Sequence, residues 1–351
     1  MKTVKLTEIC NPKQWKTLST EQLLPTGYPV YGANGKIGFY SDFNHTKSTI
    51  MITCRGATCG TINVSEPNSW INGNAMCLDN LSDNVNLRYL VHYLSNYDFR
   101  NVISGSAQPQ ITRENLNKVK VKLYEIEKQE KISNNLDKTI KIINEYKEVL
   151  SKYDTLIKSR FIEMFGDPVS NPRGWKIKTL NEICRKITDG KHGGCQVDDK
   201  SDYYFVGARE IFDLNIHYET AQKITKQDFE KDYKRCNLEI GDFCIVNTGA
   251  TIGKTAIAKD ERTTHTLLQK SVALLKVKPE EIISLYLQYS YITNESMYKV
   301  ESASAQPNLL LSKIRETKLM VPPLSLQNQF AAFVQQIDKS KFEFKSTGVA
   351  A

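Results

Sequence analysis

The sequence predicts an α/β (α+β) fold in which two similar mixed domains are joined by long helices. The chain has 351 residues, which exceeds what one ordinary hydrophobic core organises and suits two domains with connecting elements. Short segments recur in the same order in the two halves of the chain. A stretch of about 40 residues without glycine or proline separates the two copies.

Three repeated segments indicate two copies of one domain. Leu-Thr-Glu-Ile-Cys recurs as Leu-Asn-Glu-Ile-Cys, Gly-Ala-Thr-Cys-Gly recurs as Gly-Ala-Thr-Ile-Gly, and Ser-Ala-Gln-Pro occurs twice unchanged. The offsets between the copies are 174, 193 and 198, so the second copy contains insertions, mostly between its first two segments. The paired segments are residues 6–10 and 180–184, 56–60 and 249–253, and 106–109 and 304–307.

Each copy is expected to contain both strands and helices. The apolar runs at residues 50–53 and 243–246 end in glycine-rich turns, which is typical of strands. Residues 86–97 and 282–293 place apolar residues on one face at helical spacing. Each domain is therefore predicted to be mixed α/β.

The segment between the copies is predicted to be one long helix. Apolar residues recur in it with a mean spacing of about 3.6, which predicts a helical stripe that can also form a coiled-coil seam. Gly166 and Pro168 then end the helix. A shorter stripe near the C-terminus offers a partner for this narrow face. The residues expected to form the spacer and partner contacts are Ile132, Leu136, Ile140, Ile143, Leu150, Tyr153, Ile157, Phe161, Leu326, Phe330, Val334 and Ile337.

These patterns give five expected segments. The first domain covers residues 1–123, the central helix 124–166, the second domain 167–321, a short C-terminal helix 322–345 and a tail 346–351. The first copy has Tyr-Glu where the second has Pro-Pro before its helix, so we expect the central helix to begin earlier than its counterpart. The C-terminal helix is expected to cover only about half of the central one.

Composition favours a folded protein of the cytoplasm. The chain is 40% hydrophobic and 25% charged, with a net charge of +8. The surplus lies in the two flanks, because residues 125–165 contain 8 basic and 8 acidic residues. Eight cysteines without a Cys-x-x-Cys pair favour reduced thiols, and neither a membrane span nor a targeting segment is expected.

The sequence offers no expected catalytic, cofactor or metal site. Residues 249–255 resemble a phosphate-binding P-loop, but they have three residues between the glycines where that loop needs four. His192 and Cys195 lack a second pair at metal spacing. An adenine methyltransferase would need an Asn/Asp-Pro-Pro-aromatic loop, and the Pro-Asp that opens a common nuclease pattern does not occur. A P-loop nucleotide hydrolase remains the alternative from the enzyme class.

Glycine-rich loops supply candidate contacts to nucleic acid. Their basic, amide, hydroxyl and aromatic side chains suit phosphate positioning and the reading of base edges. Ordinary polar surface turns are the alternative for any one loop taken alone. The candidate DNA-binding residues are Tyr31, Asn34, Lys36, Arg55, Thr58, Asn72, Asn74, Lys191, His192, Arg209, Thr248 and Lys254.

Together these motifs resemble the specificity subunits of type I restriction–modification systems. The resemblance covers residues 4–345 and rests on the repeated turns, on Phe-Gly-Asp-Pro after the long helix and on Pro-Pro-Leu-Ser-Leu-Gln before the last one. Further matches are residues 28–32, 159–168, 171–175, 189–192, 241–242 and 321–330.

The resemblance implies a division of labour with other chains. The two domains would be target-recognition domains, each reading half of a split double-stranded DNA sequence, and the long helices would pack as an antiparallel coiled coil. Modification subunits would methylate adenine with S-adenosylmethionine, and restriction subunits would cleave DNA with ATP and Mg²⁺. This chain would have no enzymatic activity. Because the C-terminal helix is short, a truncated or self-dimerising specificity protein is the alternative.

Overall fold

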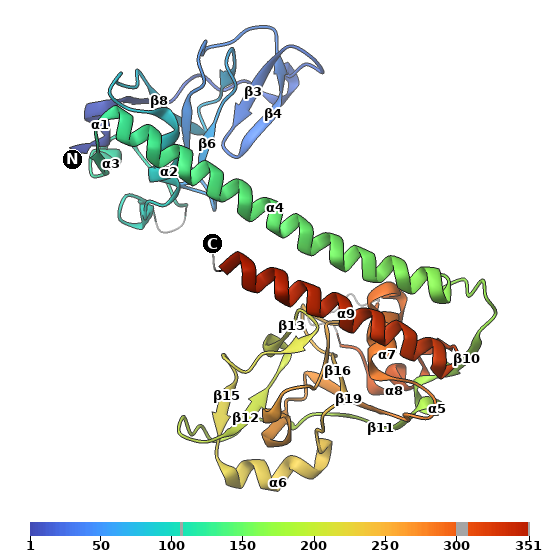
Figure 1. Ribbon diagram of the computed structural model, residues 1–351. Helices are drawn as coiled ribbons and strands as arrows, with labels where there is room; N and C mark the ends of the chain where they lie inside the picture. The colour runs from blue at the N-terminus through green and yellow to red at the C-terminus, as the bar shows by residue number, and fades with distance from the viewer. Residues whose placement is uncertain (106–107, 300–307, 350–351) are drawn as a thin grey trace. The chain divides into compact units, whose positions relative to one another are not determined.

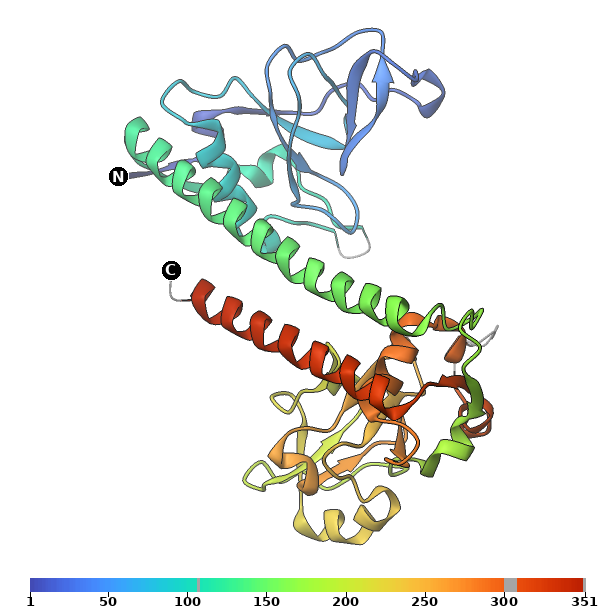
Figure 2. The same cartoon turned by 45° about the vertical axis from the view of Figure 1, so that its right-hand side comes forward.

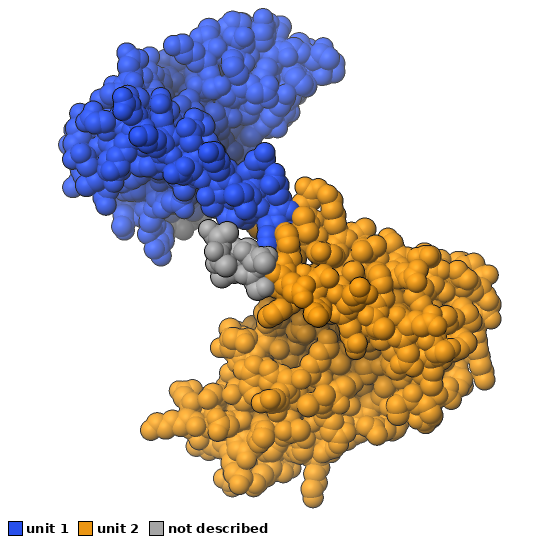
Figure 3. Space-filling model, in the orientation of Figure 1, with its two compact units in different colours: residues 1–146 blue, residues 147–351 orange. Residues whose placement is uncertain are grey.

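The computed structural model describes residues 1–105, 108–299 and 308–349. The chain forms two compact units, residues 1–146 and 147–351, which are coloured separately in Figure 3. The repeated Ser-Ala-Gln-Pro segment falls largely outside the described residues.

Unit 1 is built on a four-stranded sheet with strand order β2-β8-β5-β6. Every residue of β5 is buried, and Leu90 and Leu94 of α2 lie in the same core as Ile50 and Ile52. The strands are β1 (Lys2–Lys5), β2 (Asn11–Lys13), β3 (Tyr28–Gly32), β4 (Gly35–Tyr40), β5 (Ile50–Thr53), β6 (Ile62–Val64), β7 (Trp70–Ile71), β8 (Ala75–Asp79) and β9 (Lys120–Leu123). The helices are α1 (Leu6–Ile9), α2 (Leu87–Ser95) and α3 (Arg113–Leu116), with short 3₁₀ turns at Thr20–Gln22 and Phe99–Asn101.

Unit 2 repeats this sheet with strand order β11-β19-β16-β17. Its strands are β10 (Lys176–Thr179), β11 (Cys184–Asp189), β12 (Tyr203–Val206), β13 (Ile211–Phe212), β14 (Asn215–Ile216), β15 (Gln222–Ile224), β16 (Phe243–Val246), β17 (Thr255–Ile257), β18 (Thr266–Leu268), β19 (Val272–Val277) and β20 (Lys318–Val321). Its helices are α5 (Leu180–Ile183), α6 (Lys226–Cys236), α7 (Ser284–Thr293) and α8 (Leu311–Glu316), with 3₁₀ turns at Ala208–Glu210, Glu261–His265 and Glu295–Met297. The predicted strands 50–53 and 243–246 thus occupy equivalent places, as β5 and β16.

The two long helices are α4 (Ile126–Phe165) and α9 (Leu324–Val349), both labelled in Figure 1. They begin 198 positions apart, which equals the offset between the two copies of the last repeated segment. The two helices therefore begin at equivalent positions, and the expectation that the central helix begins earlier is wrong. The proline-free start of the first copy does not extend its helix, because strand β9 ends only at Leu123. At the other end Gly166, at φ +82°, stops α4 as predicted, and a Cβ there would lie 2.8 Å from Pro172 Cγ. Helix α9 continues four residues beyond the predicted end at 345.

Within unit 2, α9 packs antiparallel against the C-terminal part of α4 (Figure 2). The ring of Phe330 lies 5.4 Å from that of Phe161 and 5.6 Å from that of Phe165. Further along, Lys341 Nζ lies 2.6 Å from Asp154 Oδ1. Because contacts move toward the N-terminus of α4 as they move toward the C-terminus of α9, the helices run in opposite directions. The predicted antiparallel pairing is confirmed for this part of the chain.

The residues of the predicted apolar stripe differ in how deeply they are buried. Ile157, Phe161, Phe330 and Val334 are fully buried in the core of unit 2, with Leu326 and Ile337 packed against it. Ile132 packs against the core of unit 1, and Leu150 and Tyr153 are half-buried. By contrast Leu136, Ile140 and Ile143 are 39–45% exposed.

A buried glutamine fastens the start of α4 to unit 1. Gln129 Nε2 donates to the carbonyls of Asn84 and Tyr124, at 2.8 Å each, and its Oε1 accepts from the Asn86 N–H at 2.9 Å. All three partners are main-chain groups, which require hydrogen-bond partners when they are buried.

The second unit repeats this arrangement at the start of α9. Gln327 Nε2 donates to the carbonyls of Glu281 and Pro322, and its Oε1 accepts from the Ile283 N–H at 3.0 Å. Both glutamines are completely buried. The two copies therefore fasten their long helices by the same side-chain contact.

We expect Gln327→Ala to lower the free energy of unfolding by about 2 kcal/mol, because it leaves buried main-chain groups without hydrogen-bond partners. Urea unfolding of the full chain measures the change. Gln329→Ala, at an exposed position on the same helix, is the matched control and should cost less than about 0.5 kcal/mol. Equal effects of the two substitutions would contradict this assignment.

Candidate nucleic-acid interface

In unit 1 the structure brings two of the candidate loops together. The turn between β3 and β4 contains Asn34, whose Oδ1 accepts from Thr58 Oγ1 at 2.7 Å. Thr58 lies in the glycine-rich turn after β5. The Ala33 carbonyl of the first turn also accepts from Thr53 Oγ1, and from Asn63 Nδ2 at 3.2 Å. Strands β5 and β6 and the turn between them thereby hold the β3–β4 turn in place.

The third candidate loop of unit 1, residues 70–74, joins the same group. The Asn72 N–H donates to the Tyr31 carbonyl at 2.9 Å, and the Cys54 N–H donates to the Asn74 carbonyl at 3.3 Å. Asn72 is only 3% exposed, and its side chain accepts from the Leu18 N–H. All seven candidates of unit 1 thus lie on the β3–β4 hairpin, on the turn after β5 and on the segment after β7, which contact one another.

These seven residues differ in what they offer to a ligand. Tyr31 is buried, and its hydroxyl donates to Glu66 Oε1 at 3.1 Å, which favours a structural role like that of Asn72. Lys36 lies 3.6 Å from the same Glu66 carboxylate. The exposed candidates are Asn34, Lys36, Arg55, Thr58 and Asn74. DNA contact by any of them stays a prediction.

In unit 2 the segment after β18 gathers the candidate loops. The Lys191 N–H donates to the Leu268 carbonyl at 2.7 Å, and the Ala208 N–H donates to Ser271 Oγ at 3.2 Å. The Ser271 carbonyl accepts from the Asn247 N–H at 3.0 Å. Residues 190–192, 208–209 and 247–248 therefore meet at this segment. Ser271 joins two of them, and no sequence motif marked it.

The Asp-Gly-Lys-His motif of unit 2 is engaged in internal contacts. Lys191 is 13% exposed in its side chain and forms an ion pair with Asp232, which raises the pKa of Lys191. His192 Nε2 lies 3.0 Å from Asp189. Burial raises the pKa of Asp189, but hydrogen bonds from Arg235 and His192 outweigh it and hold that pKa below its ordinary value. An ionised Asp189 thus orients His192, which is itself exposed.

Of the remaining candidates of unit 2, Thr248 and Lys254 border the second glycine-rich turn, and Arg209 lies on the 3₁₀ turn at Ala208–Glu210. Thr248 Oγ1 donates to Asn308 Oδ1 at 3.2 Å, and Lys254 and Arg209 are exposed. The Gly253 N–H donates to the Val246 carbonyl and closes a hairpin between antiparallel β16 and β17. A P-loop leads from a strand into a helix, so this turn does not support the nucleotide-hydrolase alternative.

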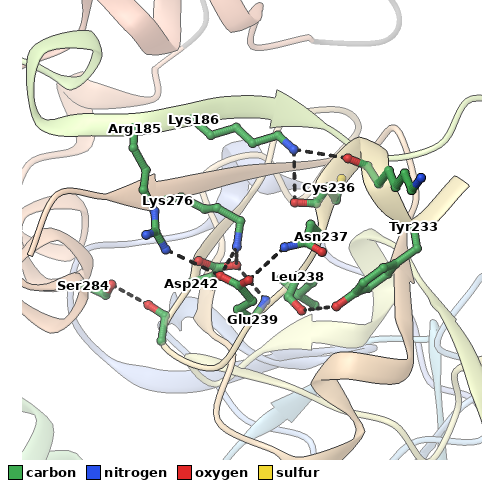
Figure 4. A network of polar contacts seen from close by, with 12 residues as sticks. Arg185, Lys186, Tyr233, Cys236, Asn237, Leu238, Glu239, Asp242, Lys276 and Ser284 are labelled. Carbon is green, nitrogen blue, oxygen red and sulfur yellow. Dashed lines mark hydrogen bonds and ion pairs between the residues drawn. The ribbon is translucent and has the colours of Figure 1, made fainter.

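A polar network of unit 2 was not expected from the sequence (Figure 4). Lys276 Nζ lies 2.6 Å from Asp242 Oδ2 and 2.9 Å from Glu239 Oε2, and the Lys276 side chain is 6% exposed. The lysine interrupts the apolar run of β19, which is the one signal of it in the sequence. The hydrogen bond from Lys276 lowers the pKa of Glu239.

Among the described residues, no helix combines the length and the apolar character that a membrane crossing requires.

Comparison with known proteins gives a consistent family. The model described as "Type I restriction modification DNA specificity domain" matches residues 1–152 and 172–349. The chain is 27% identical over 180 residues to a putative type I restriction enzyme MjaX specificity subunit from Methanocaldococcus jannaschii, a match over 48% of this chain and 40% of the relative. It is 19% identical over 318 residues to a putative specificity subunit from Haemophilus influenzae, over 88% of this chain and 80% of that one. An Escherichia coli relative, the EcoprrI specificity subunit, is 27% identical over 35% of this chain and 30% of its own length.

Two solved structures share the fold. The S subunit of a type I restriction–modification system from M. genitalium aligns with a TM-score of 0.61 at 17% identity, over 99% of this chain and 91% of that one. A chain from a structure of a type I R-M system, solved to explain complex assembly and conformational transition, aligns with a TM-score of 0.53 at 17% identity, over 99% and 93%. The chain matches less than half the length of the M. jannaschii and E. coli relatives.

Proposed function

Because this chain belongs to the type I restriction–modification DNA specificity family, we propose that each of its units reads one half of a split double-stranded DNA sequence. One observation supports this most directly. The two units share a frame of sheet, glycine-rich turn and glutamine-fastened helix, yet they present different side chains at equivalent loops. A common frame with different loops is what two reading heads of different specificity require.

The loops supply two kinds of contact. Exposed Arg55 and Lys254 each border a glycine-rich turn, so we assign them to phosphates. Exposed Asn34, Asn74 and Arg209 have the amide and guanidinium groups that read adenine and guanine edges.

Chemistry on the DNA is assigned to other chains. Modification subunits with S-adenosylmethionine would methylate adenine, and restriction subunits with ATP and Mg²⁺ would cleave. The exposed stretch of α4 around Leu136, Ile140 and Ile143 is available for a protein partner. A second copy of this chain is the alternative partner, and the mass of the purified chain in solution discriminates the two. The cytoplasmic location inferred from the sequence stays a prediction.

Mapping of methylated adenines tests the function. The chain is combined with modification subunits of its family, and the methylated positions should define two short sequences separated by a fixed unread gap. DNA treated with the chain alone is the control and should stay unmethylated. Methylation at unrelated sequences by the complex would refute the proposed role, and methylation by the chain alone would refute its non-catalytic nature.

We expect Arg55→Ala and Lys254→Ala to weaken binding of the complex to all DNA sequences alike. Each lost phosphate contact should reduce the slope of log affinity against log salt by about one. Titrations at several salt concentrations measure this slope. Lys191→Ala is the matched control, because its ammonium is paired with Asp232 inside the unit. An unchanged slope in both variants, or an equal loss in the control, would contradict the phosphate assignment.

A further inference from the structure

A histidine, a cysteine and an aspartate meet beside the sheet of unit 1. Cys77 and Asp79 are two residues apart on β8, so both side chains point to the same face. His45 precedes β5, and its main chain forms a bridge with Ser69. A ring nitrogen of His45, Sγ of Cys77 and a carboxylate oxygen of Asp79 all lie within 4.8 Å of one another. The side chains of His45 and Asp79 are only 8% and 12% exposed.

Neighbouring groups orient the histidine. The amide of Asn44 is fixed by the main chain of Ile71, which accepts from its Nδ2 at 3.1 Å and donates to its Oδ1 at 2.8 Å. The same Oδ1 lies 2.6 Å from His45 Nδ1, so Nδ1 must be the donor. His45 Nε2 then faces Asp79 Oδ1, 3.0 Å away, and the hydrogen bond between these two atoms requires a proton, whose place a cation would take.

The aspartate is oriented in the same way. Trp15 Nε1 donates to Asp79 Oδ2 at 3.0 Å, which leaves Oδ1 facing the histidine. The Trp15 and His45 rings also pack in a T-shaped arrangement, with centroids 5.1 Å apart. Hydrogen bonds of this kind to the far atoms of histidine and carboxylate ligands are typical of metal sites.

We propose that His45, Cys77 and Asp79 form a binding site for a borderline-soft divalent cation of the Zn²⁺ class. Nitrogen, sulfur and one carboxylate oxygen are the ligands that zinc prefers, whereas Mg²⁺ and Ca²⁺ require oxygen ligands. Around a tetrahedral zinc, ligand atoms are separated by about 3.5 Å. The three side chains need only small movements to reach this geometry, and solvent would supply the fourth ligand.

Within the described part of unit 2, the equivalent strand positions carry different side chains. Met51 pairs with Cys77 on β8, and its equivalent Cys244 pairs with Leu274 on β19. Leu274, an apolar residue, thus occupies the position of Cys77 in unit 2. Lys276, two residues further along β19, occupies the position of Asp79. Among the residues that the structure describes, one cation is therefore expected, in unit 1.

Titration of the metal-free full chain with Co²⁺ tests the site, because cobalt reports its ligands in the absorption spectrum. One equivalent should produce a sulfur-to-cobalt charge-transfer band, and Zn²⁺ should displace it. Cys77→Ser should abolish the band, while Cys59→Ser, the matched thiol control in unit 1, should retain it. Trp15→Phe keeps all three ligands but removes the donor to Asp79, and it should weaken zinc binding by about 10–100-fold.

Circular dichroism confirms that each variant is folded. If Cys77→Ser does not fold, His45→Gln replaces it and should weaken zinc binding by more than about tenfold. Lack of cobalt or zinc uptake by the folded wild-type chain would overturn the site. So would a charge-transfer band that survives the loss of Cys77, or one lost with Cys59.

Discussion

Exchange of residues 175–320 for the equivalent domain of a relative is expected to change one half of the methylated DNA sequence completely and to leave the other half unchanged. The exchanged segment includes strands β10 and β19 and every candidate DNA-binding residue of unit 2. Unit 1 has its own core and its own loops. Its half-site should therefore not depend on the identity of the residues after α4.

The measurement is methylation-site mapping with the hybrid chain in complex with modification subunits. The donor domain must keep an aromatic residue at position 286, because the Tyr286 ring packs 5.4 Å from Phe161 and 4.9 Å from Phe165. A second hybrid, in which residues 1–123 are exchanged for those of a relative, is the reciprocal control. It should change the other half of the methylated sequence. If one exchange altered both half-sites, the two units would not read DNA independently.

Asp242→Ala is expected to lower the free energy of unfolding by about 3–5 kcal/mol. The Asp242 and Lys276 side chains are 5% and 6% exposed, so removal of the carboxylate leaves a buried ammonium with Glu239 as its remaining acidic partner in the network. In the wild-type chain, the ion pair with Asp242 offsets the cost of burying the Lys276 ammonium. Glu239 cannot replace Asp242 in this role, because its side chain is 49% exposed and water screens its charge.

Urea unfolding of the full chain measures this loss. The control is Asp260→Ala, which breaks an ion pair with Arg262 whose partners are 36% and 39% exposed, and it should cost less than about 1 kcal/mol. Replacing Asp242 and Lys276 together by apolar residues of similar size should recover much of the stability. A loss below about 1 kcal/mol for Asp242→Ala would contradict a buried, paired lysine.

The elements best predicted from the sequence were those that depend on local periodicity. The apolar stripe and the terminating Gly166 predicted the course and the end of α4, because these signals lie within the helix and directly after it. The repeated turns predicted that β5 and β16 are equivalent. The start of α4 was misjudged because the residue type before a helix determines its start less than the contact that fastens the helix to the domain. Gln129 makes that contact with Asn84, which lies 45 positions earlier in the chain.

The candidate site was only partly predictable for a related reason. Glycine-rich loops can be recognised along the chain, but which of their side chains point outward depends on tertiary contacts. Asn72 resembles a surface amide in sequence and is buried against Leu18, 54 positions away. His45 and Asp79 form no motif, since they are 34 positions apart and meet only through the sheet.

The glutamine contact at the start of each long helix has an evolutionary consequence. Its partners are all main-chain groups, so it tolerates almost any amino acid in the domain it fastens. A genetic crossover at this joint would deliver a foreign domain onto an intact helix start. A crossover between the two copies inside the sheet would instead place Lys276 at the strand position of Asp79. Both side chains would then be separated from their partners. Gene shuffling in this lineage should therefore leave its breakpoints at the helix starts and spare the strands.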